Sequence, residues 1–407
     1  MKTIINHFTD NDLYTFTCMY YILQKYPRAE TEYCFFDRNR TCYPKGFDQL
    51  LREQLEHLEE VTITDEERAF MTRTFPFLPY WFINVFLRGY RFNSKELTIT
   101  QDEEGHLDIR VKGKWWSTIM WEMPILSAIS ELMHILNGDA LKYDAEKEYA
   151  RSYEKGRQIW ECGLTLGDMG TRRRFSFEHQ ERVIDALIAS YDEVKSETNG
   201  QCGKFTGTSN VYLAMKKNIP CLGTMSHQCI SFEEIVSGVF ECNYNVMNKW
   251  SEVYDGNVGI FLYDCFGDNV FFNNLSKRMA MTFCGLRIDS GVEEEQVDLI
   301  VEKYKQLGID PMTKQAVFSN GLNIERAIEI HNYCKGKITD SYGVGTFLTC
   351  DVTDCKPMNI VVKLIRGRIT ESREWHPCVK LSCDKGKTLG DKAKCDYLLS
   401  VLNEANQ

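Results

Sequence analysis

Seven short clusters of glycine and polar residues between positions 170 and 346 carry the side chains that are best suited to catalysis or binding. The cluster around His227 is the most informative, because a neutral imidazole can accept a proton, a metal or a phosphoryl group. The alternative for a single histidine is a structural role with its ring nitrogens hydrogen-bonded. The clusters are GTRRR (170–174), GTSN (207–210), GTMSHQ (223–228), DCFGD (264–268), RIDSG (287–291), SNGLN (319–323) and GVGT (343–346).

Several of these clusters have residues that could bind a phosphate group. Small residues ahead of a helix or turn, as in SNGLN and GVGT, expose backbone N–H groups that can hold a phosphate, although such turns can equally be plain connections. Arg287 and Asp289 lie on the same side of a strand end, where they could hold a pyrophosphate and a ribose diol or simply form a salt bridge. The three arginines 172–174 suit carboxylate or phosphate, because the guanidinium group is planar and always charged.

The clusters alternate with predicted helices, which indicates parallel βα units. In a closed parallel barrel the C-terminal strand ends converge on one mouth, so the seven clusters would face a common site. The clearest helix is predicted at 293–307, where Gly308 ends it. Strands are predicted at 204–206, 219–222, 258–264, 285–289, 316–319 and 337–342.

The first third of the chain has a different pattern. It predicts a helix over 10–26, an amphipathic helix near 48–58 and a β-hairpin over 96–114. After residue 351, alternating strands at 359–364 and 378–383 are expected to pack back on this front layer. We therefore predict an α/β fold: an irregular βα barrel with an added α+β layer built from the N-terminal third and the C-terminal strands. The predicted domains are residues 1–144, 145–351 and 352–407.

Composition bounds the partners and the compartment. The net charge of −10 over 407 residues argues against nucleic acid as a partner. Sixteen cysteines without an apolar leader predict reduced thiols and a cytoplasmic protein. The apolar stretch 115–136 carries charged residues and predicts a buried helix, so no membrane span is expected. Two C-x4-C spacings, Cys350/Cys355 and Cys378/Cys383, leave a metal site open, although zinc motifs use tighter spacing.

Over residues 9–364 the motifs resemble nicotinate phosphoribosyltransferase, a type II phosphoribosyltransferase family. The resemblance rests on GTRRRFS, GTSN, GTMSHQ, DCFGD, LRIDSG, FSNGLN and YGVGT in this order and spacing, with DNDLYTFTCM and KWWSTIMWEMPILSAISE before them. It implies an enzyme that forms nicotinate mononucleotide and pyrophosphate from nicotinate and 5-phosphoribosyl 1-pyrophosphate, coupled to ATP hydrolysis, in the salvage route to NAD. It also implies a phosphoribosyltransferase barrel over 145–351, magnesium, ATP as co-substrate and a homodimer with shared active sites.

The resemblance implies a role for individual residues. His227 would be phosphorylated by ATP, and Arg287 and Asp289 would hold the pyrophosphate and the ribose. Arg172 would meet the nicotinate carboxylate, and Tyr14 from a partner subunit would stack on the pyridine ring. Ser209 would favour nicotinate, because the nicotinamide-using relatives have an aspartate at the matching position. The remaining phosphoribosyl pyrophosphate ligands would be Arg173, Ser319, Gly321, Gly343, Gly345 and Thr346.

Four positions depart from the family pattern. Met169 stands where the family usually has an aromatic residue, which leaves the second stacking wall undefined. The other departures are Val292, Asn320 and Cys265.

Two other functions fit part of the pattern: a nicotinamide phosphoribosyltransferase, and a non-catalytic phosphate-binding protein on the same fold. A scaffold has no need of His227 together with Arg287 and Asp289, which favours a transferase.

Overall fold

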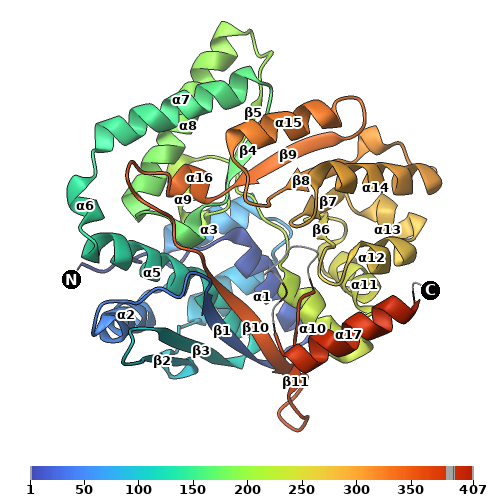
Figure 1. Cartoon of the computed structure of the whole chain (residues 1–407), viewed down its shortest axis with the longest axis horizontal. Coiled ribbons are helices and arrows are strands. Elements are labelled where there is room, and N and C mark those ends of the chain that lie inside the picture. Colours follow the sequence, from blue (N-terminus) through green and yellow to red (C-terminus); the bar gives the residue numbers. More distant parts are fainter. Residues whose placement is uncertain (1, 382–387, 389, 406–407) are drawn as a thin grey trace.

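The computed structural model describes residues 2–381, 388 and 390–405, and its strands form two sheets of opposite character (Figure 1). An antiparallel sheet has the order β11-β10-β1-β3-β2, and a parallel sheet has the order β5-β4-β9-β8-β7-β6. This mixture confirms the predicted α/β fold. The antiparallel strands are β1 (Glu30–Asp37), β2 (Leu97–Gln101), β3 (Leu107–Lys114), β10 (Ile360–Arg368) and β11 (His376–Pro377).

The antiparallel sheet joins the two ends of the sequence. β1 pairs with β10 on one side, from Glu30 opposite Arg368 to Asp37 opposite Ile360, and with β3 on the other. In Figure 1 the orange β10 accordingly runs beside the blue β1. The predicted hairpin is present as β2 and β3. The predicted strand 378–383 is wrong in its described part, because β11 ends at Pro377, and Cys383 lies outside the described residues.

The parallel strands curl around a shared interior. Residues from or directly after every one of them line a cavity of about 160 Å³, including Met169, Thr206, Ile260, Arg287, Val317 and Ser341. The predicted strand 219–222 is reduced to one bridge between Thr208 and Cys221, because Pro220 lacks the N–H that a ladder needs. No pairing in the described chain joins this edge to β6, so a closed barrel stays a prediction. The strands are β4 (Thr165–Asp168), β5 (Lys204–Thr208), β6 (Ile260–Leu262), β7 (Gly285–Ile288), β8 (Gln315–Phe318) and β9 (Thr339–Val344).

Helices cover both sheets, and the clearest predicted one is present as α14. Its apolar stripe, which includes Val297, Ile300 and Tyr304, is buried. The helices are α1 (Leu13–Lys25), α2 (Phe47–Glu56), α3 (Asp65–Thr74), α4 (Trp115–Thr118), α5 (Glu122–Leu136), α6 (Asp139–Lys142), α7 (Ala145–Glu161), α8 (Phe177–Glu197), α9 (Val211–Lys217), α10 (His227–Ser237), α11 (Cys242–Tyr254), α12 (Asp268–Asn274), α13 (Lys277–Thr282), α14 (Glu293–Gln306), α15 (Ile324–Cys334), α16 (Thr346–Thr349) and α17 (Lys392–Ala405).

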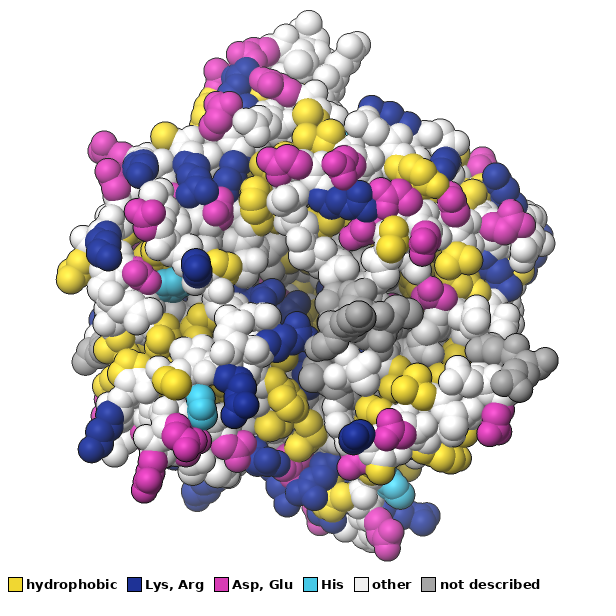
Figure 2. All heavy atoms as spheres, viewed as in Figure 1, with side chains coloured by type: hydrophobic (Ala, Val, Ile, Leu, Met, Phe, Trp, Pro, Cys, Tyr) yellow, Lys and Arg dark blue, Asp and Glu magenta, His cyan; other side chains and the backbone are white. Residues whose placement is uncertain are grey.

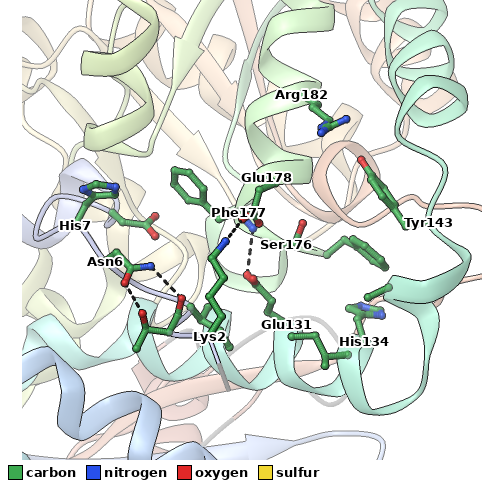
Figure 3. Close-up of a pocket in the computed structure, with 16 residues that line it drawn as sticks. Lys2, Asn6, His7, Glu131, His134, Tyr143, Ser176, Phe177, Glu178 and Arg182 are labelled. Atoms are coloured by element: carbon green, nitrogen blue, oxygen red, sulfur yellow. Dashed lines mark hydrogen bonds and ion pairs between the residues drawn. The ribbon is translucent and has the colours of Figure 1, made fainter.

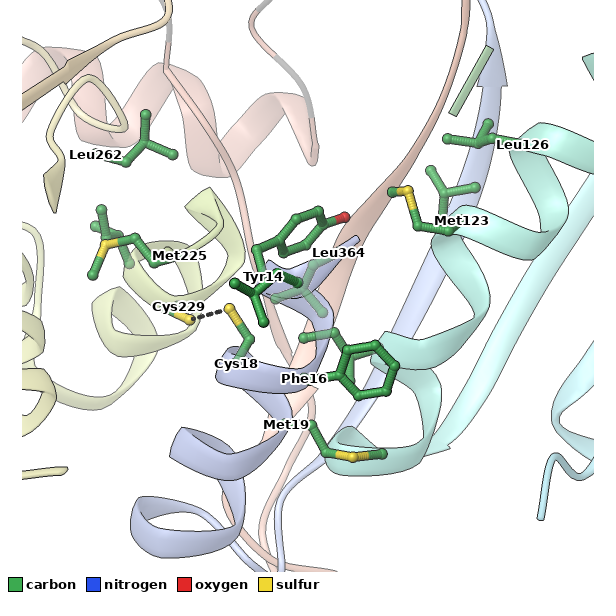
Figure 4. Close-up of a cluster of buried hydrophobic side chains, with 14 of the residues drawn as sticks. Tyr14, Phe16, Cys18, Met19, Met123, Leu126, Met225, Cys229, Leu262 and Leu364 are labelled. Carbon is green, nitrogen blue, oxygen red and sulfur yellow. Dashed lines mark hydrogen bonds between the residues drawn. The ribbon is translucent and has the colours of Figure 1, made fainter. Parts of the chain in front are cut away.

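The main core lies where α1 meets α5, α10 and the antiparallel sheet. Figure 4 shows Phe16 and Cys18 on α1 among side chains of these elements, and Cys18 Sγ lies 3.7 Å from Cys229 Sγ. The apolar stretch Trp115–Leu136 is long enough to cross a membrane, but 89% of its most apolar window is buried inside the protein. It is therefore a core helix, as predicted. The described cysteines form no disulfide.

Candidate active site

A cavity of about 460 Å³ lies at the C-terminal ends of the parallel strands. Five of the seven clusters line it directly, and Figure 2 shows a hollow in this face with Lys and Arg side chains gathered in it. The DCFGD cluster contributes Asp264, which does not line the cavity but binds His227. The GTSN cluster does not line the cavity. The lining residues from the clusters are Gly170, Arg172, Arg173, His227, Arg287, Asp289, Ser319, Asn320, Gly321, Leu322, Asn323, Gly343, Gly345 and Thr346.

His227 begins α10 and is held through one ring nitrogen. Its Nε2 lies 2.8 Å from Asp264 Oδ1 and 2.8 Å from the Nζ of Lys380. Ser290 donates to the other oxygen of Asp264 at 2.6 Å, so the carboxylate is fixed in turn. Among the described residues the Nδ1 of His227 makes no hydrogen bond, which leaves this nitrogen available for chemistry.

His227 is neutral at physiological pH. Burial and the nearby Lys380 ammonium group lower its pKa to about 4, against the opposing effect of Asp264. Burial opposes ionisation of Asp264, but His227 and Lys380 hold the pKa of its carboxyl well below its usual value. With the Nε2 proton donated to Asp264, the neutral imidazole carries its lone pair on Nδ1, and the Lys380 ammonium group at Nε2 then acts as a nearby charge and not as a hydrogen-bond donor. His227 is thus prepared to act as a nucleophile through Nδ1.

Replacing Lys380 by glutamine should raise the pKa of His227 from about 4 towards its ordinary value of 6.5. The reason is that the substitution removes a cation 2.8 Å from Nε2, and a nearby positive charge disfavours the imidazolium form. An NMR titration of the histidine ring measures this shift. Lys394→Gln is the matched control, because Lys394 pairs with Glu234 instead. An unchanged His227 titration in Lys380→Gln would refute this electrostatic account.

Arg287, Asp289 and Ser319 form one hydrogen-bonded group in the same cavity. Arg287 donates through Nε to Ser319 Oγ at 2.7 Å, and Ser319 donates to Asp289 Oδ1 at 2.6 Å. Burial raises the pKa of Asp289, but Arg287 and His227 outweigh it and lower this pKa, so the side chain is a carboxylate. The structure therefore brings Arg287 and Asp289 together beside His227, with Asp289 Oδ2 4.0 Å from its Nε2.

Backbone rather than side chain lines the far end of the cavity. Gly321 has a φ of +58°, a conformation that glycine adopts without cost. A β-carbon on Gly343 would lie 2.3 Å from the sulfur of Met169, so a larger residue there would displace this side chain. Met169 thus packs against the floor of the cavity, at the position where the family usually has an aromatic residue. Gly345 and Thr346 complete this surface ahead of α16.

Arg172 and Tyr14 meet at one carboxylate of the same chain. The Tyr14 hydroxyl donates to Glu122 Oε2 at 2.7 Å, and Arg172 Nη1 lies 3.6 Å from Glu122 Oε1. Tyr14 is buried and does not line the cavity. The chain's own Tyr14 thus lies beside Arg172, and the expectation that Tyr14 of a partner subunit stacks on the pyridine ring stays a prediction.

Ser209 is placed differently from its expected role. Its hydroxyl is buried and donates to Asp12 Oδ1 at 2.8 Å. Because a hydroxyl has one proton to donate, a hydrogen bond from Ser209 to nicotinate would require this bond to break. Asp12 also supplies a carboxylate at this position, so the absence of an acid at residue 209 does not remove negative charge from this region.

Several cations of the cavity went unpredicted. Arg38 follows β1, Lys363 lies in β10 and Lys380 follows β11, so all three come from the antiparallel sheet or its connections. Burial, together with Arg172 and Lys380, lowers the pKa of Lys363 to about 8. No strand-end glycine cluster marks these residues in the sequence. The cavity consequently carries more positive charge than its loops alone supply, which favours anionic ligands.

The three arginines of GTRRR have separate functions. Arg172 and Arg173 line the cavity, whereas Arg174 is fully buried and binds Asp10 through both Nη atoms at 2.7 and 2.8 Å. Burial and repulsion from Arg172 and Arg38 lower the pKa of Arg173 to about 10. Arg173 has no carboxylate within 4.0 Å in the described structure, so it can take an anionic ligand.

Two carboxylates of this site could hold a divalent cation. Asp264, Asp289 and His227 offer ligand atoms within 4.8 Å of one another. Carboxylate oxygens suit Mg²⁺. Cys350 and Cys378, one from each C-x4-C spacing, pack in separate hydrophobic clusters, and Cys383 lies outside the described residues.

A second cavity, of about 500 Å³, lies away from these loops (Figure 3). Lys2 and Glu178 form an ion pair at its edge, and Glu131 accepts a hydrogen bond from the Phe177 N–H at 3.1 Å. None of the predicted site residues lines it. The cavity that contains His227 is therefore the candidate active site.

Comparison with known proteins gives a single family. The model of the nicotinate phosphoribosyltransferase (NAPRTase) family matches residues 164–406, and that of its N-terminal domain matches residues 9–130. The chain is 36% identical to a nicotinate phosphoribosyltransferase of Desulforapulum autotrophicum over 98% of this chain and 99% of the relative. Its relative from Chromohalobacter salexigens is 34% identical over 98% of each chain. A crystal structure of nicotinate phosphoribosyltransferase from Porphyromonas gingivalis superimposes with a TM-score of 0.92 at 38% identity, over 98% of this chain and 100% of that one.

Proposed function

Because the chain belongs to the nicotinate phosphoribosyltransferase family, we propose that it forms nicotinate mononucleotide from nicotinate and phosphoribosyl pyrophosphate, with ATP hydrolysis coupled through His227, in NAD salvage. The observation that carries this proposal is the meeting of three groups in one cavity. These are the His227–Asp264 pair, the Arg287–Asp289–Ser319 group and Arg172.

Different residues of the cavity bind the sugar, the pyrophosphate, the 5-phosphate and the pyridine. Nicotinate attacks C1 of the ribose through its ring nitrogen as the C1–O bond to pyrophosphate breaks. The sugar becomes cationic, and Asp289 stabilises that charge while Arg287 and Arg173 hold the departing pyrophosphate. The backbone of Gly321, Gly343, Gly345 and Thr346, with Ser319, binds the 5-phosphate. Arg172 orients the pyridine by pairing with its carboxylate.

The phosphoryl group of ATP goes to Nδ1 of His227. The lone pair of Nδ1 attacks the γ-phosphorus and ADP leaves, while Nε2 keeps its proton against Asp264. The Asp264 carboxylate stabilises the more positive ring of phosphohistidine, whereas Lys380 lies 2.8 Å from Nε2 and not beside the nitrogen that takes the phosphate. Water later returns the phosphoryl group to solution, so ATP hydrolysis is complete in each cycle.

Magnesium is part of this proposal, with Asp264 and Asp289 as its ligands. When bound it would neutralise the phosphate oxygens of pyrophosphate or ATP. The ammonium group of Lys380 lies 3.0 Å from Oδ2 of Asp264, one of these two carboxylates.

The test is a transferase assay with nicotinate, phosphoribosyl pyrophosphate and magnesium, with and without ATP. We expect mononucleotide in both cases and more of it with ATP, accompanied by ADP. Nicotinamide in place of nicotinate should be a poor substrate, because it would leave the cationic cavity without an anionic partner. Equal use of nicotinamide would favour a nicotinamide phosphoribosyltransferase, and no product with either pyridine would favour a non-catalytic phosphate-binding protein.

We further propose a homodimer. The resemblance implies sites shared between subunits, whereas in the structure Tyr14 and Arg172 of one chain meet at Glu122. Mixed dimers of Tyr14→Ala and Arg172→Ala chains distinguish the two arrangements: recovered activity supports shared sites, and mixed dimers that stay inactive support sites built within one chain. Light scattering of the purified protein measures the assembly, and a single-chain mass would contradict the dimer.

A further inference from the structure

A second group of metal-ligating side chains lies outside the candidate active site. It consists of His134 near the end of α5, Asp139 at the start of α6 and Cys355 in the segment after α16. One ligand atom of each residue lies within 4.8 Å of those of the other two. We propose that these three residues form a binding site for a divalent transition metal of the zinc class.

The ligand chemistry supports this metal class. One nitrogen, one oxygen and one sulfur ligand suit Zn²⁺, whereas Mg²⁺ and Ca²⁺ prefer oxygen alone. In a tetrahedral zinc site neighbouring ligand atoms lie about 3.3 to 3.8 Å apart. His134 Nδ1 is already 2.9 Å from Asp139 Oδ2, so small movements of the side chains would complete the geometry. The fourth position would remain for water or another ligand.

Contacts behind the group orient the imidazole. His134 Nε2 lies 3.4 Å from the sulfur of Cys350, and the ring packs against Phe175 with 4.7 Å between centroids. A partner for the second ring nitrogen is what metal-bound histidines have in proteins, because it fixes the ring and its tautomer. Figure 3 shows His134 below Tyr143 at one end of the second cavity. His134 has 4% of its side chain exposed, so the ring is held in place.

The electrostatic environment also favours a cation. The carboxylates of Asp139, Glu148 and Asp354 place negative charge around the Cys355 thiol. A negative potential that disfavours a thiolate favours a divalent cation at the same point. On binding, the S–H bond breaks, the proton passes to solvent and the sulfur bonds to the metal, so one proton is released for each ion taken up by Cys355.

The ion would join the segment after α16 to α5 and α6. Phe175, Cys350 and Val352 form a small hydrophobic cluster of their own, apart from the main core, with Tyr143 and Cys355 packed against it. The same segment carries Asp351, which lines the candidate active site and accepts a hydrogen bond from Arg151 at 2.7 Å. A metal here would therefore stabilise one wall of that cavity without contacting a substrate.

Titration of the chelator-treated, full-length protein with Co(II) tests the site. We expect near-ultraviolet thiolate-to-cobalt absorption that saturates at one equivalent and disappears when Zn(II) is added. Cys355→Ser should lose this absorption, and Asp139→Asn should bind Co(II) at least tenfold more weakly. Cys42→Ser is the matched control, because Cys42 is exposed and belongs to neither site; it should behave as the wild type.

Three results would overturn the assignment: no thiolate absorption in the wild type, full absorption in Cys355→Ser, or absorption that depends on Cys350 instead. Circular dichroism of each variant confirms that it is folded. The His227 group contains no cysteine and gives no thiolate band. Failure here is therefore distinguishable from failure of the proposed function, which the transferase assay measures.

Discussion

Replacing His227 by alanine will abolish the ATP-dependent, acid-labile phosphate label while leaving some transferase activity. His227 is the histidine of the cavity, its pKa of about 4 keeps it neutral, and Nε2 is bound to Asp264 so that Nδ1 can accept the phosphoryl group. The sugar is held by Arg287, Asp289 and the glycine loops, which the substitution leaves in place. Incubation with γ-labelled ATP and magnesium, followed by acid and base treatment, measures the label.

His331 provides the matched control. It forms a similar pair with Asp340, with 2.8 Å between His331 Nδ1 and Asp340 Oδ2, and it does not line the cavity. His331→Ala should therefore label as the wild type does. Equal labelling of His227→Ala and the wild type would exclude His227 as the acceptor. The Asp264→Asn variant should take up the phosphate label more slowly than the wild type, because the His227 ring loses the carboxylate that fixes its tautomer.

Replacing Arg172 by glutamine should lower kcat/KM for nicotinate far more than kcat/KM for nicotinamide. Truncating one partner of a buried charge pair costs roughly 2 kcal/mol or more, a loss of about 30-fold or more. Nicotinamide makes no such pair, so its use should change much less. For Arg172→Lys, kcat/KM for nicotinate should lie between the values of the wild type and Arg172→Gln, because lysine keeps the charge but lacks the planar guanidinium group. Steady-state kinetics with both pyridines measures the effect.

The control for this experiment is Arg182→Gln. Arg182 lines the second cavity, so its loss should leave both values near those of the wild type. A parallel fall for nicotinate and nicotinamide in Arg172→Gln would mean that Arg172 positions the loop or the sugar and does not recognise the carboxylate. Glu122 would then be its main partner, at 3.6 Å.

The loop residues of the site could be predicted because the sequence repeats one arrangement. Apolar strands followed by glycine and polar residues place Arg287, Asp289 and Ser319 at neighbouring strand ends, and parallel pairing of β7 with β8 brings them together. This reasoning needs only local pattern and strand direction.

The other side of the site could not be read from the sequence in the same way. Lys363 lies in β10, where alternation predicts a strand but not which element its faces meet. Arg38 and Lys380 join the cavity only because β1 and the chain after β11 lie across from the parallel strands. Ser209 follows the strand pattern, yet its hydroxyl binds Asp12, a long-range contact that local spacing does not specify.

The pairing of β1 with β10 has a consequence for synthesis on the ribosome. Glu30 and Arg368 are paired across 338 residues of sequence. At about 5 to 20 residues per second, the nascent β1 must wait roughly 17 to 70 s for its partner strand to be made. During that interval one edge of β1 has free N–H and C=O groups that another chain could pair with. Growth conditions that slow translation should therefore increase aggregation of the newly made protein, and a chaperone that covers this edge should reduce it.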